Sequence, residues 1–193
     1  MSISKSRSSW FVALPVVPGA TDWFTRLSPP PDGTRLLAAA DLHLTVAFLG
    51  HVGEARARAA FRGLPPTAIP RFEALLGATV AMGNPRHPSA LCALVERVGV
   101  HGPSIAESLL GPRDGMLEAA GLPVETRAMK PHITLARLRR RAGANERRQA
   151  VAWADEINLT STRISLDRVG LYTAARDRKE RAYDIVESRD LLS

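Results

Sequence analysis

The chain has 193 residues, of which 45% are hydrophobic and 23% are charged, and its formal net charge is +7. This composition excludes a largely disordered protein, and the length is sufficient for one domain with a sizeable core. No apolar run approaches the roughly 20 residues that a membrane-spanning helix needs. The basic balance favours polyanionic partners such as RNA, although an arginine-rich genome would explain it equally well.

The single cysteine, Cys92, excludes an intrachain disulfide and is consistent with a reducing compartment. It lies in an apolar run, which favours a buried structural thiol over a nucleophile. Lys5 and Arg7 followed by the apolar residues 10–17 resemble a short signal peptide. That run is too short and contains Pro15, so we expect a first strand and a cytoplasmic protein.

Turn-forming residues divide the chain into predicted strands and helices. Residues 1–8 are polar, and we expect them to be disordered. Predicted strands cover residues 10–17, 42–48, part of 69–82, 90–98, 131–138, 160–171 and 182–186, with a turn at 83–85 and another at 176–181. Predicted helices cover residues 18–27, 54–62, 104–120 with a break at Gly111-Pro112, and 145–155. The order lacks the glycine-rich turn of a Rossmann βαβ unit and favours an α+β fold with antiparallel or mixed sheets.

One segment occurs twice. Residues 43–49 are His-Leu-Thr-Val-Ala-Phe-Leu, and residues 132–138 are His-Ile-Thr-Leu-Ala-Arg-Leu. Side chains two apart in a strand leave by the same face, so each copy presents its His and its Thr side by side. Two such strands facing each other would place two imidazoles and two hydroxyls around one small pocket.

Breaking a phosphodiester would suit such a pocket. The reaction needs a group that takes a proton from the nucleophile, a group that gives a proton to the leaving oxygen, and donors for the non-bridging oxygens. An imidazole has a pKa of about 6.5, so His43 and His132 are candidates for the base and the acid near neutral pH. Thr45 and Thr134 are candidates for holding the non-bridging oxygens. The near symmetry leaves the two histidine roles open, and our starting assignment takes His132 as the base and His43 as the acid.

The sixth position of the repeat differs between the copies, with Phe48 in the first and Arg137 in the second. A guanidinium suits bidentate phosphate binding, and an aromatic ring can stack on a nucleobase. Both residues lie five positions after the histidine, and in a regular strand an odd separation points a side chain to the opposite face. Arg137 therefore reaches the phosphate only if the strand bulges or ends before it, or if its side chain curls around. Phe48 fits core packing as well as stacking.

The two His-x-Thr motifs, about ninety residues apart, are followed by Phe48-Leu49-Gly50 in the first copy and by Arg137 in the second, which Pro131 precedes. This pattern resembles the 2H phosphoesterase superfamily. Within it, the similarity is to the bacterial and archaeal RNA 2',3'-cyclic phosphodiesterases, also known as 2'-5' RNA ligases.

Residues 11–15 and 170–172 also resemble family segments, so the resemblance covers nearly the whole chain. Residues 36–42 and the middle third depart from the family pattern, which leaves substrate specificity open. The resemblance implies one domain over residues 1–193, built of two pseudo-symmetric lobes around a central groove. Each lobe would be an antiparallel or mixed sheet with helices outside.

The resemblance also implies the chemistry: metal-independent hydrolysis of RNA 2',3'-cyclic phosphate ends to the 2'-phosphate. Ligation would be the same reaction reversed, with a 5'-hydroxyl in place of water. We expect RNA as the partner, no cofactor and a monomer. The alternatives are another cyclic phosphate, 2'-5' linked oligonucleotides, or an RNA-binding module without catalysis.

The remaining polar residues suggest no second site. His51, His87 and His101 lie in loop-like contexts, and we expect them at the surface. The His-x-Thr spacing lacks the paired ligands of a zinc or two-metal centre, and no P-loop glycine pattern for ATP is present. Residues 139–141 are three arginines, which fit a solvated run or a guide for RNA.

Overall fold

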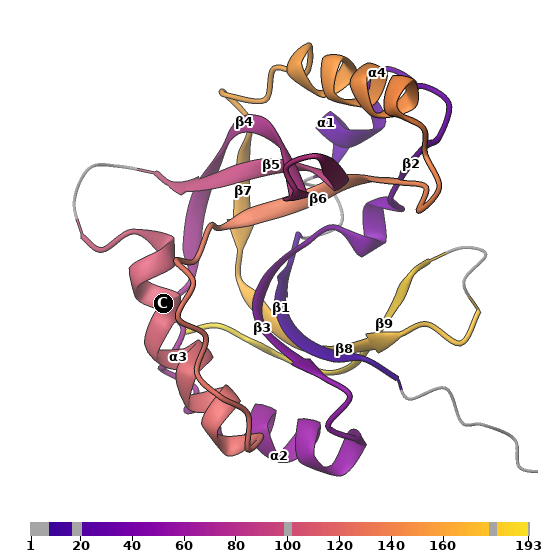
Figure 1. Cartoon of the computed structure of the whole chain (residues 1–193). Coiled ribbons are helices and arrows are strands. Elements are labelled where there is room, and N and C mark those ends of the chain that lie inside the picture. Colours follow the sequence, from indigo (N-terminus) through magenta and orange to yellow (C-terminus); the bar gives the residue numbers. More distant parts are fainter. Residues whose placement is uncertain (1–7, 17–20, 99–101, 178–180, 193) are drawn as a thin grey trace, which may run out of the picture.

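The computed structural model describes residues 8–16, 21–98, 102–177 and 181–192 (Figure 1). Its strands are β1 (Trp10–Pro15), β2 (Thr34–Leu36), β3 (His43–Gly50), β4 (Phe72–Asn84), β5 (His87–Arg97), β6 (His132–Leu138), β7 (Arg163–Leu166), β8 (Arg168–Ala174) and β9 (Tyr183–Asp190). Its helices are α1 (Asp22–Thr25), α2 (Glu54–Gly63), α3 (Ile105–Ala119) and α4 (Ala144–Asp155), with a 3-10 turn η1 (Ala39–Asp41). Residues 1–7 and His101, for which we predicted disorder and a surface position, lie outside the described residues.

The described strands form one antiparallel sheet in the order β7-β4-β5-β6-β3-β1-β8-β9, with β2 paired to β6. β3 and β6, which carry the two copies of the repeat, are neighbours in the middle of this order (Figure 1). They share a single bridge, between Leu44 and Ile133, so the sheet consists of two halves joined at one narrow point. The α+β class and the two antiparallel lobes are confirmed.

The helices lie on one face of this sheet, which we call the helix face. α2 and α3 bury Phe61, Ile105 and Leu109 in the main core, while α4 buries Trp153 against a smaller cluster behind β5 and β6. α3 begins with a capping box: the Ser104 hydroxyl accepts the Glu107 N–H (3.2 Å) and the Glu107 carboxylate accepts the Ser104 N–H (2.8 Å). Among the described residues, no helix is both long and apolar enough to cross a bilayer.

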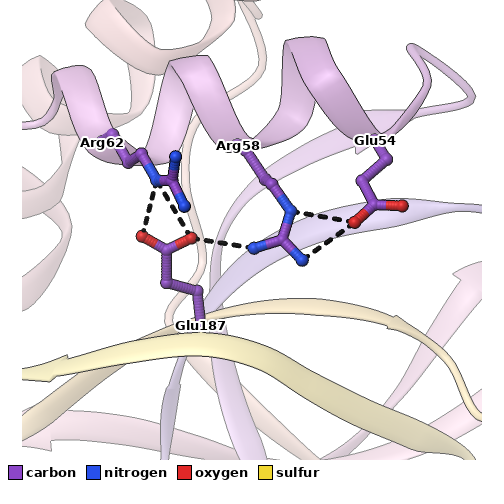
Figure 2. A network of polar contacts seen from close by, with 4 residues as sticks. All are labelled: Glu54, Arg58, Arg62 and Glu187. Atoms are coloured by element: carbon purple, nitrogen blue, oxygen red, sulfur yellow. Dashed lines mark hydrogen bonds and ion pairs between the residues drawn. The ribbon is translucent and has the colours of Figure 1, made fainter.

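A charged network fastens α2 to the edge strand β9. Arg58 of α2 lies between Glu54 (2.9 Å) and Glu187 of β9 (3.0 Å), and Arg62 binds the same Glu187 carboxylate at 3.0 Å (Figure 2). These hydrogen bonds and charges lower the pKa of Glu187. Because the partners are exposed or partly exposed, water screens these charges, and the network fixes the position of α2 more than it stabilises the fold.

Two predicted elements are wrong in a way that the packing explains. α3 runs through Gly111-Pro112 without a break, because Ile105, Leu109 and Met116 on its buried face hold it against the core despite the N–H that proline lacks. The predicted strand 160–171 is two strands, with Asp167 between them. The chain passes there from β7, paired with β4, to β8, paired with β1 in the other half of the sheet.

Other boundaries shift by a few residues. The β4–β5 pairing continues to Asn84 and His87, so the turn lies at residues 85 and 86 instead of 83–85, and the Asn84 side chain accepts the Arg86 N–H at 2.9 Å. The first helix covers Asp22–Thr25 and ends two residues before the predicted end, whereas residues 18–20, where we predicted its start, lie outside the described residues. The strand β2 was not predicted at all.

Candidate active site

The two copies of the repeat meet at the bridge between Leu44 and Ile133. In an antiparallel pair, the residues that flank a bridge face each other across the strands, so His43 lies on the side of Thr134, and Thr45 on the side of His132. Leu44 and Ile133 are fully buried toward the helix face, whereas all four polar residues are half-buried. The opposite face, which we call the site face, therefore carries the two histidines and two threonines together.

Each copy contains a β-bulge at the same place. In β3, Val12 and Ala13 of β1 pair with Ala47 and Thr45, which leaves Val46 as the extra residue. In β6, Leu91 and Cys92 of β5 pair with Ala136 and Thr134. The residue skipped there is Leu135, and both skipped residues are the fourth of the repeat. A bulge of this kind interrupts the alternation of side chains, so the residues after it point to the face opposite to the one that a regular strand would give them.

The bulges decide where Phe48 and Arg137 point. After the extra residue, the sixth position pairs with Phe11 in the first copy and with Ala90 in the second. Each of these partners lies two residues from the partner of the threonine in the same copy, and therefore on the same face of its strand. Both sixth residues are consequently on the site face, together with His and Thr. Phe48 is 62% exposed there, which excludes core packing as its role. Arg137 was expected to reach the phosphate only if its strand bulged, ended before it or let its side chain curl around, and the strand does bulge.

The two imidazoles are held in the same way. Nδ1 of His43 donates to the backbone carbonyl of Asp41, and Nδ1 of His132 donates to that of Lys130, each at 2.6 Å. Because a carbonyl oxygen can only accept, the proton of each neutral ring lies on Nδ1. In both rings Nε2 is left as the atom that can take or give a proton to a ligand.

The surroundings of His43 are aromatic. Its ring centroid lies 5.0 Å from that of Phe11, 5.3 Å from Tyr172 and 5.4 Å from Tyr183. This burial lowers the pKa of His43 to about 4, against a smaller opposing effect of Asp41; the charges of Arg137 and His132 lower it further. At neutral pH His43 is therefore uncharged in the free protein.

Asp41 is a residue of the site that sequence reasoning missed. The residue is 3% exposed, and its carboxylate accepts the backbone N–H groups of Ala182 (2.7 Å) and Tyr183 (3.2 Å), while its backbone carbonyl accepts a hydrogen bond from the His43 ring. Asp41 thus fixes both His43 and the strand that carries Tyr183. No local pattern could have indicated this role, because the partners are 141 and 142 residues away.

Tyr172 was also missed as a site residue. It is buried below His43, stacked on Phe11 at 4.9 Å, and its hydroxyl has no hydrogen-bond partner among the described residues. Burial raises the pKa of this phenol, with a further contribution from Asp41, so the hydroxyl stays protonated.

The surroundings of His132 and Thr134 are more open and more basic. The Thr134 hydroxyl lies 3.6 Å from Sγ of Cys92, its cross-strand neighbour. Cys92 is fully buried, as predicted, and burial raises its pKa against the opposing effects of Thr134 and of the Arg137 charge.

The remaining histidines that the structure describes lie outside this site. His51 and His87 are exposed, as predicted. Within the described part of the chain, no group of three or more His, Cys, Asp or Glu side chains is close enough to hold a metal ion.

Comparison with known proteins finds similarity in structure but not in sequence. No protein-family model matches the chain, and no curated protein matches it significantly. Escherichia coli LigT, a 2'-5' RNA ligase, superimposes with a TM-score of 0.65 over 96% of this chain and 98% of LigT, at 19% identity. The protein TT0787 of Thermus thermophilus gives a TM-score of 0.65 over 95% of this chain and 97% of its own, at 23% identity.

The chain has the fold of LigT. A structure described as a phosphoesterase shares this fold at a TM-score of 0.63, covering 97% of this chain and 100% of its own, at 20% identity. All three neighbours are 2H phosphoesterases. The LigT fold therefore accounts for nearly the whole chain, including the half of the sheet built from the middle third, where the sequence resemblance was loose.

Proposed function

We propose that the chain is a 2H phosphoesterase that hydrolyses RNA 2',3'-cyclic phosphate ends to the 2'-phosphate without a metal ion. The observation that carries this proposal is the pair of bulged His-x-Thr strands, which share one bridge and present both imidazoles on one face. Acid and base on opposite sides of one phosphorus atom are what in-line displacement at a phosphodiester requires.

The protonation of His43 supports an assignment of roles. A base must be neutral before it acts, and the aromatic enclosure keeps His43 neutral at pH 7. The hydrogen bond of His132 is exposed, and water there can solvate the charged imidazolium that an acid must carry. We therefore assign the base to His43 and the acid to His132, the reverse of our starting assignment. The negative charge of a bound phosphodiester would raise the pKa of His43, but it would not remove the aromatic enclosure that distinguishes this ring from His132.

In this mechanism, water attacks phosphorus and gives a proton to Nε2 of His43. The bond between phosphorus and the 3'-oxygen breaks, and that oxygen takes a proton from Nε2 of His132. The hydroxyls of Thr45 and Thr134 and the guanidinium of Arg137 hold the non-bridging oxygens, on which negative charge builds. Exposed Phe48 offers a stacking surface for the terminal base.

A nucleotide substrate agrees with LigT complexes that have been solved with 3'-AMP and with phosphate. The same geometry would serve another cyclic phosphate, or hydrolysis and ligation of 2'-5' linked oligonucleotides. The proposal further takes residues 1–193 as one two-lobed domain that acts as a monomer. The single buried thiol is compatible with a reducing compartment, so we place the activity in the cytoplasm.

The test is hydrolysis of RNA with a 2',3'-cyclic phosphate end in the presence of EDTA. We expect turnover to 2'-phosphate ends, and a loss of roughly a hundredfold or more in His43→Ala and in His132→Ala. His51→Ala, a change of the same kind at an exposed loop position, serves as the matched control and should keep full activity. A wild type without turnover whose RNA binding survives both motif changes would indicate a non-catalytic RNA-binding module, and full activity in either motif variant would remove that histidine from the mechanism.

A further inference from the structure

The strand β2, which was not predicted, brings a second arginine to the site face. β2 pairs with the end of β6, and in this register Arg35 lies directly opposite Arg137. Directly opposite residues of an antiparallel pair project from the same face, with Cβ atoms about 4.5–5.5 Å apart. Leu36, the next residue of β2, packs against the core of the helix face, which leaves exposed Arg35 on the site face.

Neither arginine is neutralised by a residue that the structure describes. Within the described residues, the side chains of Arg35 and Arg137 make no hydrogen bond and no ion pair. Arg139, two residues further along, binds Glu146 at 2.7 Å. Like charges directly opposite each other in a sheet are unfavourable, so an anion between Arg35 and Arg137 would relieve a cost that the free protein bears.

The two arginines do not face the same part of the site. The charge of Arg137 acts on His43 and on Cys92, the neighbour of Thr134, so its guanidinium is close to the reacting phosphate. β2 lies alongside the end of β6 that is furthest from His132, on the edge of β6 where β3 also pairs, so Arg35 is displaced from Arg137 by one strand spacing. A second phosphate group next to the first would fit between them.

We propose that Arg35, together with Arg137, forms a second anion subsite, which binds the phosphate on the 5'-oxygen of the reacting nucleotide. This inference rests on the proposed function. A 2',3'-cyclic phosphate occupies both the 2'- and the 3'-oxygen, so any further phosphate of the same nucleotide lies on its 5' side. Arg35 then makes the enzyme select nucleotides that carry a 5' phosphate group, whether free or joined to the preceding nucleotide of an RNA chain.

The activity test uses three substrates: adenosine 2',3'-cyclic phosphate with a 5'-hydroxyl, the same molecule with a 5'-phosphate, and a diadenosine dinucleotide with a cyclic phosphate end. We expect kcat/KM to be roughly tenfold higher for the two substrates with a 5' phosphate group, as one charge-assisted hydrogen bond provides. Arg35→Ala should abolish this preference and leave the 5'-hydroxyl substrate unaffected. A gain for the dinucleotide alone assigns the subsite to the internucleotide phosphate, and a gain for both assigns it to any 5' phosphate.

Arg140→Ala is the matched control, because Arg140 is an exposed arginine of the same basic run without a described partner, and its loss changes the net charge equally. It should keep the preference. An Arg35→Ala variant that loses activity equally on all three substrates, or a wild-type protein without preference, overturns the subsite while the proposed function stands.

Binding separates the two proposals further. Adenosine 2',5'-bisphosphate should bind the wild type roughly tenfold more tightly than adenosine 2'-phosphate, and Arg35→Ala should remove the difference. If none of the cyclic substrates is hydrolysed but this difference is found, the proposed function fails and the subsite is supported. Equal affinities for the two nucleotides overturn the subsite.

Discussion

The first copy of the repeat lies among aromatic side chains and the second among basic ones. In the first, Phe11, Tyr172 and Tyr183 surround His43, and Phe48 lies opposite Phe11. In the second, Arg137 lies opposite Arg35 and no described ring contacts His132. The backbone is the same in both, with the same bulge and the same carbonyl held by Nδ1.

Under the proposed function, this difference adapts a repeated strand to an asymmetric substrate. The repeated strand gives both imidazoles the same backbone setting and places them on one face, as the proposed in-line reaction requires of its acid and its base. The neighbouring strands, β1 and β8 on one side and β2 and β5 on the other, then give each copy its own surroundings. A nucleotide likewise has an apolar base at one end and charged phosphates at the other.

The largest effect that we expect concerns the protonation of His43. Its pKa is lowered to about 4 from an unfolded value of 6.5, so the unfolded chain binds the proton more readily. Between these values, stability falls as the pH falls, by up to about 3 kcal/mol in total. Urea unfolding of the wild type at pH 7 and pH 4 should show this loss. His43→Gln should lose less stability over the same pH change, because the contribution of His43 is absent. A ring of His43 that titrates above pH 6 by NMR would remove the basis for its role as the base.

Variants at the sixth position of the repeat test whether the two copies contribute differently to activity. Arg137→Ala should lower kcat/KM tenfold to a hundredfold, because a cation close to the developing charge is lost. Phe48→Ala should cost only a few-fold and mainly in KM, since stacking binds the substrate equally before and during reaction. Steady-state kinetics on one cyclic-phosphate substrate compares the two variants, and equal losses in kcat would contradict the division.

The smallest effect concerns the cross-strand neighbour of each threonine. Ala13 lies opposite Thr45, whereas Cys92 lies opposite Thr134 and contacts its hydroxyl. Cys92→Ala makes the two copies alike at this place. We expect kcat to fall about twofold to threefold and stability to fall by about 1 kcal/mol, because a weak S–H···O contact and some packing are lost. A hundredfold loss of kcat would instead place the thiol in the reaction.

Sequence patterns predicted the features that depend on one strand at a time. The shared face of His43 and Thr45 follows from a period of two, and the two lobes follow from the repeat. The bulge at Val46 does not, because a bulge exists only relative to the partner strand β1. The three residues of β2 are a strand only because β6 lies beside them, so Arg35 could not be connected with Arg137 from local pattern.

Asp41 shows the same limit in another form. A lone carboxylate before a strand has no periodic signature, and its value here comes from the two backbone donors that a distant segment supplies. The uninterrupted α3 is a further case, since only the packed core explains why Pro112 is tolerated.

The bridge between Leu44 and Ile133 is the single rung between β3 and β6, and under the proposed function it lies beneath the reacting phosphate. Both strands are firmly laddered on their outer sides, to β1 and to β5, so each copy keeps its internal geometry if the halves tilt. The main core is continuous beneath both halves, so a change in its packing would alter the span between the imidazoles without breaking either ladder.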